Sequence, residues 1–301
     1  GDRRRILMVF LLAHCVGFPF GRESRVKGYT RRVSDPFPQR IVCLTEETTE
    51  WLYLLGESDR IVGISGFTVR PHRARKEKPR VSAFTSAKMD RIVDLRPDLV
   101  LGFSDLQADI AAELIRRGID VHVFNQRSVR EILAMLVQLG ALVGAGERAL
   151  DWVADWRRRA EERRRSLPPA KERPRVYFEE WDDPLISGIR WVSELVELAG
   201  GFDCFPELAR EGLGKDRIIA DPLTVVSRRP DVILGSWCGK KFRPEKVAAR
   251  PGWQSIPAVQ QGAIHEVKSA LILQPGPAAL TDGLHEIVGL IDRWHESRHA
   301  R

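Results

Sequence analysis

Hydrophobic and polar positions between residues 39 and 295 follow a pattern that predicts strands and helices in alternation. Several short runs are apolar at nearly every position, as expected of strands that are covered on both faces of a sheet. In the first half these runs are 40–44 (RIVCL), 60–65 (RIVGIS), 98–103 (DLVLGF) and 120–124 (DVHVF). Such strands, separated by helices, indicate a mostly parallel sheet with helices on both sides.

Longer segments with helical spacing lie between the strands. They are 45–56 (TEETTEWLYLLG), 106–118 (LQADIAAELIRRG) and 128–144 (SVREILAMLVQLGALVG). The apolar positions of the first segment are Trp51, Leu52, Leu54 and Leu55. The glycine that follows them is expected to end the helix.

One longer helix is predicted in the middle of the chain, over 147–167 (ERALDWVADWRRRAEERRRSL), where two prolines follow. Its apolar residues share one narrow stripe and are Ala149, Val153, Trp156 and Ala160. The rest of the segment is heavily charged and lacks the glycine and serine of a flexible linker. We therefore predict a rigid connector that lies across the surface of two lobes.

The alternation restarts after this connector. The predicted elements are strands over 175–180 (RVYFEE), 231–236 (DVILGS) and 263–267 (AIHEV), and helices over 191–201 (WVSELVELAGG) and from about 278 to 294. The second half thus has the same kind of pattern as the first.

One phrase occurs once in each half. Residues 96–103 read RPDLVLGF, and residues 229–236, 133 positions later, read RPDVILGS. Each copy follows a short amphipathic stretch, so we predict the same helix–turn–strand unit in two similar lobes. The fold class is therefore α/β: two Rossmann-like lobes with mostly parallel sheets, joined by one long rigid helix, with a ligand cleft between the lobes. The predicted division is a leader and linker (1–38), an N-terminal lobe (39–146), a connecting helix (147–170) and a C-terminal lobe (171–301).

Composition adds little about partners. The chain has 301 residues, enough for two modest cores, and a formal charge of +7. Its arginines gather in Arg3–Arg5 and in 156–165 (WRRRAEERRR), where two glutamates are interleaved as on a solvated helix face. Because no basic stripe with interleaved aromatic residues occurs, we predict no nucleic-acid partner.

The N-terminal residues resemble an export signal. Arg3–Arg5 precede eight apolar residues (ILMVFLLA), too few to span a bilayer but typical of a secretory signal. The following LAHC (12–15) resembles a lipoprotein cleavage box, and residues 16–38 have the composition of a linker. We expect a periplasmic protein or an exported lipoprotein; the alternative is a disordered leader on a cytoplasmic protein.

Residues just past the predicted strands form the candidate site, because ligands of open α/β sheets bind outside the carboxyl ends of the strands. These segments are rich in aromatic and amide side chains, which suits a large, flat, partly apolar ligand held by stacking and a few hydrogen bonds. The candidate ligand-binding residues are Phe67, Phe84, Phe103, Ser104, Asp105, Glu180, Trp181, Trp237, Lys240 and Gln274. For each aromatic residue the alternative is packing into the core of its own lobe.

Trp181 is the aromatic residue on which we rely most. It is flanked by Glu179 and Glu180 and by Asp182 and Asp183, so its neighbours are expected to be strongly hydrated. An indole in that setting gains little from core packing unless a ligand covers it.

Enzyme functions have weaker support. The chain lacks G-x-G-x-x-G after the first strand, G-x-x-x-x-G-K-[ST] and G-x-S-x-G, and no histidine pairs with a carboxylate at metal spacing. We therefore expect no intrinsic cofactor and no bound metal. The remaining alternative is a cytoplasmic α/β enzyme that uses the carboxylates of 179–183 (EEWDD) as acid and base, with Cys238 activated by Lys240 and Lys241. Whether Cys238 instead forms a disulfide with Cys204 stays open.

Across residues 39–295 the chain resembles a known family. The stretches RIVCLTEETTEWLYLLGESDRIVGIS, RPRVSAF, MDRIVDLRPDLVLGFSD and PLISGIRWVSELVELAGGFDCFPEL are similar to the cobalamin-type, helical-backbone (class III) substrate-binding proteins of ABC importers. The resemblance implies a non-enzymatic protein that binds cobalamin or a related corrinoid between its lobes and delivers it to a permease and ATPase complex. We expect it to act as a monomer.

The resemblance also implies roles for single residues. Phe67 and Phe84 match ring-contacting aromatic residues of the first lobe, and Trp181 lies on the segment that faces them. Asp90 matches an acidic residue that docks onto arginines of the permease. In the second lobe the matching position is Leu223, and the nearest acidic residue is Asp221.

The chain departs from the family at two further positions. The usual Ser-Pro after the first strand is Thr45-Glu46 here, and Ala199 occupies one position of a disulfide found in some relatives. The same class also carries ferric siderophores and haem. An anionic chelate of that kind is the alternative ligand, and charged side chains that would suit it are Lys240, Lys241, Arg70 and Arg243.

Overall fold

The computed structural model describes residues 36–299, so the predictions about the export signal and most of the linker fall outside the described residues. The strands are β1 (Ile41–Cys43), β2 (Ile61–Ser65), β3 (Arg80–Ser82), β4 (Leu99–Phe103), β5 (Val121–Phe124), β6 (Arg175–Asp182), β7 (Leu185–Ser187), β8 (Phe202–Asp203), β9 (Val232–Gly235) and β10 (Ile264–Glu266). The α-helices are α1 (Glu46–Leu54), α2 (Ala74–Glu77), α3 (Met89–Asp94), α4 (Ala108–Arg116), α5 (Val129–Leu142), α6 (Gly146–Arg165), α7 (Arg190–Ala199), α8 (Leu223–Arg228), α9 (Pro244–Ala248), α10 (Pro257–Gln260), α11 (Ser269–Ile272) and α12 (Leu284–His299).

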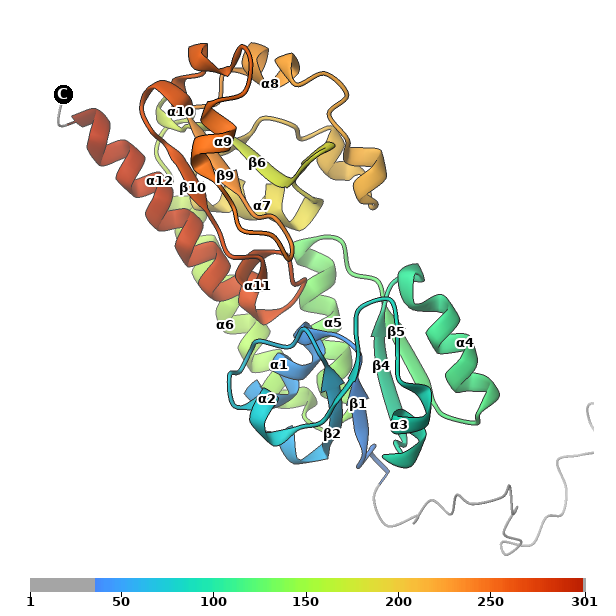
Figure 1. Ribbon diagram of the computed structural model, residues 1–301. Coiled ribbons are helices and arrows are strands. Elements are labelled where there is room, and N and C mark those ends of the chain that lie inside the picture. The colour runs from blue at the N-terminus through green and yellow to red at the C-terminus, as the bar shows by residue number, and fades with distance from the viewer. Residues whose placement is uncertain (1–35, 300–301) are drawn as a thin grey trace, which may run out of the picture. The chain divides into compact units, whose positions relative to one another are not determined.

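The first lobe is built on a parallel sheet with the strand order β3-β2-β1-β4-β5. Alternate residues of β1 face opposite sides of this sheet. Ile41 and Cys43 pack with residues of α1 and α5, whereas Val42 packs with residues of α3 and α4. Helices therefore cover both faces of the sheet, as the unbroken apolar runs predicted (Figure 1).

The second sheet has the order β10-β9-β6-β7, with β8 also paired to β6. Strands β8, β9 and β10 are parallel to their neighbours, and β7 is antiparallel, with Trp181 opposite Ile186. Strand β6 is longer than predicted and ends at Asp182, because its last residues pair with β7. The prediction that this strand ends at Glu180 and that Trp181 follows it is therefore wrong.

The repeated phrase has the same structure in both lobes. Strand β4 pairs with β1 and strand β9 pairs with β6, so both copies occupy the same place beside the first strand of their sheet. The opening arginine of each copy has a positive φ, 46° and 47°. Two positions later, the Asp98 carboxylate accepts a hydrogen bond from Arg40 N, and the Asp231 carboxylate accepts one from Arg175 N, both at 2.9 Å. Each carboxylate thus fixes the start of its lobe's first strand.

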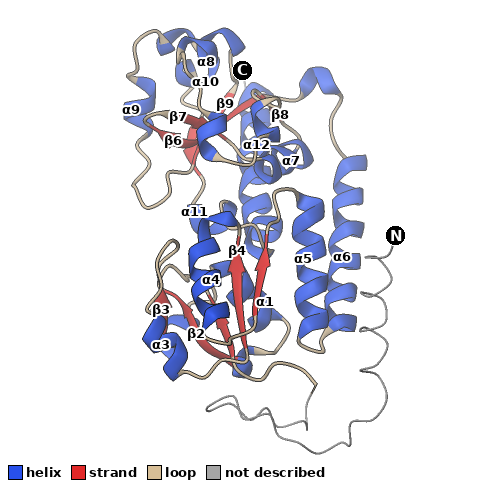
Figure 2. Cartoon of the chain, turned by 90° about the vertical axis from the view of Figure 1, so that its right-hand side faces the viewer, coloured by secondary structure: helices blue, strands red, loops and turns tan. Residues whose placement is uncertain are grey.

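The connecting helix is α6, a single helix of 20 residues, which corresponds to a length of about 30 Å. Its buried residues are the four of the predicted stripe: Ala149, Val153, Trp156 and Ala160. Figure 2 shows α6 beside α5 along the first lobe and leading on toward the second. The prediction of a rigid connector with one narrow apolar stripe is confirmed.

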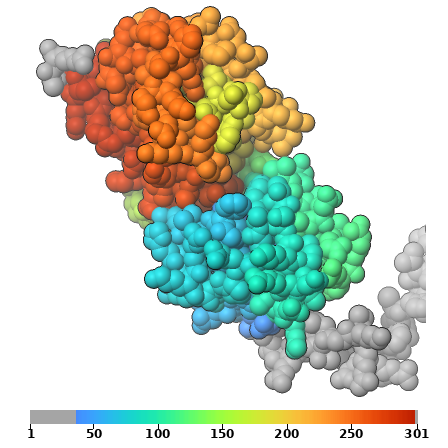
Figure 3. Space-filling model, in the orientation of Figure 1, coloured from blue at the N-terminus to red at the C-terminus, as the bar shows by residue number. Residues whose placement is uncertain are grey.

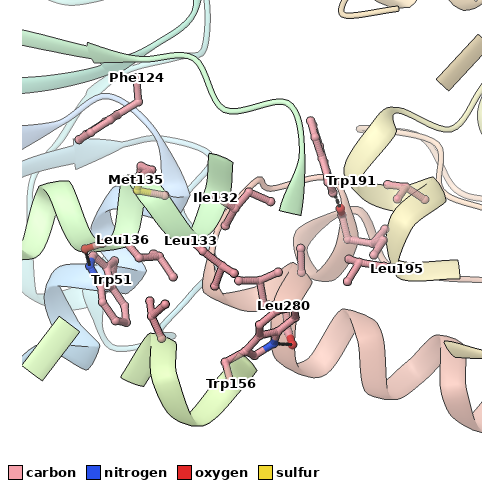
Figure 4. Close-up of a cluster of buried hydrophobic side chains, with 14 of the residues drawn as sticks. Trp51, Phe124, Ile132, Leu133, Met135, Leu136, Trp156, Trp191, Leu195 and Leu280 are labelled. Atoms are coloured by element: carbon pink, nitrogen blue, oxygen red, sulfur yellow. Dashed lines mark hydrogen bonds between the residues drawn. The ribbon is translucent and has the colours of Figure 1, made fainter. Parts of the chain in front are cut away.

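One hydrophobic cluster is shared by the two lobes, with members from α1, α5, α6, α7 and α12 (Figure 4). Three indole N–H groups in it donate hydrogen bonds to backbone carbonyl oxygens: Trp51 to Leu136 (2.8 Å), Trp156 to Leu280 (2.7 Å) and Trp191 to Ile272 (2.8 Å). Each of the three indole N–H groups therefore keeps a hydrogen-bond acceptor although its side chain is buried. Separating the lobes would expose this common core to water.

Two predicted helices differ from the structure in detail. The prediction that Leu54 faces the core is wrong, because its side chain is 55% exposed. Three glutamates of the same helix are buried instead, and they belong to the site described below. The closing helix was expected from about residue 278, but a π-helical turn (Ala279–Gly283) comes first and α12 begins at Leu284.

Candidate functional site

The strand ends of the two lobes face one another. The Gln126 side chain, which follows β5, donates a hydrogen bond to Pro275 O at 3.0 Å. The start of α1 packs on the same turn, since a Cβ atom on Gly276 would lie 2.4 Å from the Glu47 Cβ. In Figure 3 the surface is indented where yellow and orange segments of the second lobe meet green and cyan segments of the first. A separate hollow of about 760 Å³ lies along α6 and contains none of the predicted site residues.

Glu50 links the two lobes at the floor of this region. One of its carboxylate oxygens accepts a hydrogen bond from Ala278 N at 3.1 Å, and the other accepts one from Arg70 Nε at 2.7 Å. Arg70 also lies 2.8 Å from the carboxylate of Asp282. Because Arg70 is held by two carboxylates, the expectation that it serves an anionic ligand is not supported by this geometry.

Three carboxyl groups are buried in the first turn and a half of α1. Burial raises the pKa values of Glu46, Glu47 and Glu50, and that of Glu47 to about 8. The Thr45 hydroxyl donates a hydrogen bond of 2.7 Å to Glu47, which opposes this shift. Their place at the positive end of a helix also favours negative charge. Sequence reasoning missed these residues because it assigned only the apolar positions of the helix to the interior.

Aromatic residues form the wall of the first lobe. Phe67, after β2, is 58% exposed, and Phe84, after β3, is half-buried. Phe103 is buried, with its ring centroid 6.5 Å from that of Phe84 and 4.7 Å from the guanidinium carbon of Arg127. Phe67 and Phe84 thus keep part of their surface accessible, whereas Phe103 is buried and packs beside Phe84.

The residues after β4 shape this wall. Ser104 is buried with a φ of 62°, and its Oγ accepts a hydrogen bond from Leu106 N at 3.3 Å. The Gln107 side chain donates to Phe84 O at 2.8 Å and so holds the loop that carries this aromatic residue. Asp105 is exposed. The hydroxyl oxygen of Ser104 therefore caps the turn that follows β4.

Trp181 lies on the wall of the second lobe and is half-buried, with part of its indole packed on that lobe's own core. Its Nε1 donates a hydrogen bond to Asp183 O at 2.9 Å. The Lys240 ammonium lies 5.4 Å from the ring centroid and 2.6 Å from an Asp182 carboxylate oxygen. This arrangement fixes the indole and leaves part of its surface uncovered.

Glu179 is fully buried behind Trp181, so the expectation that all the acidic neighbours of Trp181 are hydrated is wrong. Its carboxylate accepts hydrogen bonds from Arg250 NH1 (2.6 Å), Arg250 NH2 (2.9 Å), Trp237 Nε1 (3.0 Å) and the Tyr177 hydroxyl (3.1 Å). Trp237 is only 3% exposed, and its ring packs on that of Phe242. In this structure Trp237 is a core residue with no open face.

A buried ion pair lies beside this wall and was not predicted. Arg217 is 2% exposed and donates to both carboxylate oxygens of Glu180, at 2.7 and 2.9 Å. Burial lowers the pKa of Arg127 of the first lobe, and the charge on Arg217 lowers it further, whereas the charges of Asp105 and Glu180 oppose this shift. The ion-pair partner of Arg127, Asp105, lies 3.8 Å away. At this distance the ion pair between Arg127 and Asp105 is longer than a direct charge-assisted hydrogen bond.

Comparison with known proteins identifies the family. The family described as periplasmic binding protein matches residues 41–271 of this chain. The chain belongs to the periplasmic binding protein family. This confirms the family resemblance and shows that the chain is a binding protein and not an enzyme.

Relatives in the family are distant but cover most of the chain. The uncharacterised ABC transporter substrate-binding lipoprotein YvrC of Bacillus subtilis is 24% identical over an alignment of 265 positions, which covers 83% of this chain and 79% of that protein. The vitamin B12-binding protein of Vibrio vulnificus is 23% identical over an alignment of 252 positions, which covers 80% of this chain and 86% of that protein.

Solved structures show the same fold. The periplasmic vitamin B12-binding protein BtuF of Vibrio cholerae has a TM-score of 0.68 at 21% identity and covers 86% of this chain and 99% of that one. A periplasmic haem-binding protein of Pseudomonas aeruginosa has a TM-score of 0.72 at 19% identity and covers 85% of this chain and 93% of that one. These similarities confirm the prediction of two α/β lobes joined by a helix.

The cysteine enzyme considered from the sequence is also contradicted by the side chains of this family member. Burial raises the pKa of the Cys238 thiol, and the charges of Glu46 and Glu180 raise it further, which is the opposite of activation. Lys240, one of the two expected activating cations, donates hydrogen bonds to the carboxylate of Asp182 instead. Cys43, Cys204 and Cys238 are free thiols.

The remaining predicted residues lie at the surface or at the edge of the site. Gln274 is half-buried in the turn that receives the Gln126 hydrogen bond. The Asp90 side chain on α3 is 95% exposed and lies 3.3 Å from Arg117. Asp221 is exposed and accepts a hydrogen bond from Leu223 N at 2.9 Å, at the start of α8. None of the helices between residues 36 and 299 combines the length and apolar character needed to cross a bilayer.

Proposed function

We propose that this protein binds cobalamin or a related corrinoid between its lobes and delivers it to an ABC importer. The observation that carries this proposal is the pair of aromatic walls: Phe67 and Phe84 on the first lobe and Trp181 on the second. Large flat ligands are held by stacking on such side chains and by a few well-placed polar groups. Polar side chains also follow the strands of the first lobe, with Glu46 after β1 and Arg127 after β5.

Relatives support this ligand class and the export of the chain. The vitamin B12-binding protein of Vibrio vulnificus covers most of the chain, and the Bacillus subtilis relative is named as a lipoprotein of an ABC transporter. We infer that the protein acts outside the cytoplasm as a monomer, with residues 39–146 and 171–301 as its two lobes and 147–170 as the connector between them.

Isothermal titration of the purified protein with cyanocobalamin tests the proposal. We expect one site with a dissociation constant in the micromolar range or below, a binding free energy of about −8 kcal/mol or better. A matched titration with haemin and with a ferric siderophore provides the comparison. If cyanocobalamin gives no heat of binding and haemin or the ferric siderophore binds saturably, the corrinoid assignment is rejected. The proposed site between the lobes would then be retained for a different chelate.

An anionic metal chelate such as haem or a ferric siderophore is the second candidate, and Arg127 favours it. Its guanidinium is partly buried, and its ion-pair partner Asp105 is 3.8 Å away, longer than a direct charge-assisted hydrogen bond. A carboxylate of the ligand could take a closer position. Arg127→Gln should then weaken an anionic chelate at least about tenfold and a neutral corrinoid much less.

Docking to the permease is proposed to involve Asp90. Its carboxylate is almost fully exposed on α3, as a docking residue must be. The position 133 residues later, in the equivalent helix α8, is Leu223, which is 54% exposed. We infer that the second lobe uses either the exposed Asp221 or an apolar contact through Leu223.

A further inference from the structure

A basic groove lies at the outer edge of the first sheet, beside strand β3. It encloses about 610 Å³ and is lined by β3, by residues just before it and by the start of α3. All the charged side chains that line it are basic: Arg75, Lys78, Arg80, Lys88 and Arg91. The sequence showed these residues only as scattered positions, and the fold brings them together around one hollow.

No acidic side chain neutralises the basic groove. Within residues 36–299, none of the five basic side chains takes part in an ion pair or a side-chain hydrogen bond that the structure shows. The acids nearest in sequence are bound elsewhere: Glu77 accepts a hydrogen bond of 2.6 Å from the Tyr53 hydroxyl, and Asp90 lies against Arg117. Like charges gathered around one hollow repel one another and create a positive potential that attracts anions.

Ser82 supplies an independent sign of a ligand. It lines the groove at the end of β3, is 8% exposed, and its Oγ has no hydrogen-bond partner among the described residues. Its backbone is satisfied, since Ser82 O accepts a hydrogen bond of 2.7 Å from Gly66 N. Buried hydroxyl groups without a partner are rare in folded proteins. Ser82 lines the same hollow as the five basic residues, and its hydroxyl can donate to an oxygen of an anion bound there.

We propose that the basic groove binds a multivalent oxyanion of the phosphate class, held by the Ser82 hydroxyl and the surrounding cations. The site lies outside the carboxyl ends of β2 and β3, where Gly66 and Ser82 stand, which is where open α/β sheets bind ligands. None of the predicted ligand-binding residues lines the groove, so the proposal does not depend on which chelate binds between the lobes.

Isothermal titration of the whole chain at low salt tests the proposal with two free anions, inorganic phosphate and pyrophosphate. A third arm measures sedimentation with vesicles of phosphatidylglycerol, and vesicles of phosphatidylcholine serve as the neutral control. We expect saturable binding that weakens as salt is added. Binding of pyrophosphate without vesicles identifies a free anion, and binding of phosphatidylglycerol alone identifies a lipid phosphate; either result supports the proposal.

Two variants locate the site. Arg80→Gln/Lys88→Gln removes two groove cations and is expected to weaken binding at least about tenfold, since each charge-assisted hydrogen bond accounts for about that factor. Lys171→Gln/Lys246→Gln removes the same charge from exposed positions outside the groove and should have little effect. Equal losses in the two double variants, or no saturable binding in any arm, would overturn the proposal.

Ser82→Ala provides a test that does not alter charge. Because the hydroxyl has no partner in the protein, its removal should leave the melting temperature unchanged or raised, while the affinity for the anion falls several-fold. Unchanged affinity in this variant would also count against the proposal.

Discussion

The substitution Glu47→Gln tests how the buried Glu47 carboxyl, at the contact between the two lobes, affects stability. The Glu47 carboxyl is 2% exposed, accepts a hydrogen bond from Thr45 and packs against Gly276 of the opposite lobe. Glutamine has the same size and can accept the same hydrogen bond, so the substitution removes the titration and little else. Any change in the pH dependence of stability can then be assigned to this carboxyl.

The sign and size of the effect follow from the pKa of Glu47. Burial raises it to about 8, whereas the ordinary value is 4.5. Below pH 4.5 both the folded and the unfolded chain hold the proton, so the contribution to stability is fully present there. As the pH rises, the unfolded chain loses the proton first, and the free energy of unfolding falls by about 1.4 kcal/mol per pH unit for this group. Between pH 5.5 and 7.5 the loss amounts to up to about 3 kcal/mol.

Urea unfolding followed by tryptophan fluorescence at pH 5.5, 6.5 and 7.5 measures this effect. We expect the stability advantage of Glu47→Gln over wild type to be small at pH 5.5, about 1.4 kcal/mol, and to grow by up to about 3 kcal/mol between pH 5.5 and pH 7.5. Glu57→Gln is the matched control, because Arg60 and Arg148 lower the pKa of Glu57, so that its effect is constant over this range. Parallel pH dependences of wild type and Glu47→Gln would refute the reasoning.

The structure leads to three other expected outcomes. Trp181→Ala should weaken cobalamin binding at least about tenfold. It should lower the free energy of unfolding by only about 2 kcal/mol, roughly half the cost at a fully buried tryptophan. Normal affinity with a much larger loss of stability would make Trp181 a core residue. Arg250→Met leaves the Glu179 carboxylate buried without its cation, so it should lower the free energy of unfolding, measured with urea, by about 3–5 kcal/mol. A decrease below about 1 kcal/mol would contradict a stabilising role of this ion pair. Asp90→Lys should leave cobalamin affinity and melting temperature unchanged and slow uptake by the reconstituted permease, and normal uptake would exclude Asp90 from docking.

The fold was largely predictable because its signals are local. The stripe of Ala149, Val153, Trp156 and Ala160 repeats at the period of a helix, and the structure buries these four residues of α6. The phrase at 96–103 and 229–236 carries its own turn and capping aspartate, so it adopts the same structure beside either first strand. Periodicity and turn chemistry act within a few residues, and they can be read from one sequence.

The candidate site was less predictable because its charges are placed by distant partners. Arg217 and Glu180 are 37 positions apart, and only the fold brings them within 2.7 Å. Glu179 reads as one of several surface acids, yet it is fully buried, because Arg250, 71 positions away, supplies its cation. Charged residues are rarely buried without such a partner. The glutamates at the start of α1 did offer a signal, since acids gathered at a helix N-terminus after a buried strand often face the sheet edge where ligands bind.

The way the lobes are joined limits how the site can work. Their shared core, the bond from Gln126 to Pro275 and the contact of Glu47 with Gly276 all lie beneath the interlobe region. A wide hinge motion would have to break these buried contacts, and packed cores do not deform continuously. If Phe67, Phe84 and Trp181 bind the ligand as proposed, they would be held nearly at their final separation before it arrives, which would reduce the entropy lost on binding. Selectivity must then come from the shape and charge of fixed walls, so substitutions at Phe67 and Trp181 should change which ligand binds more than how far the lobes move.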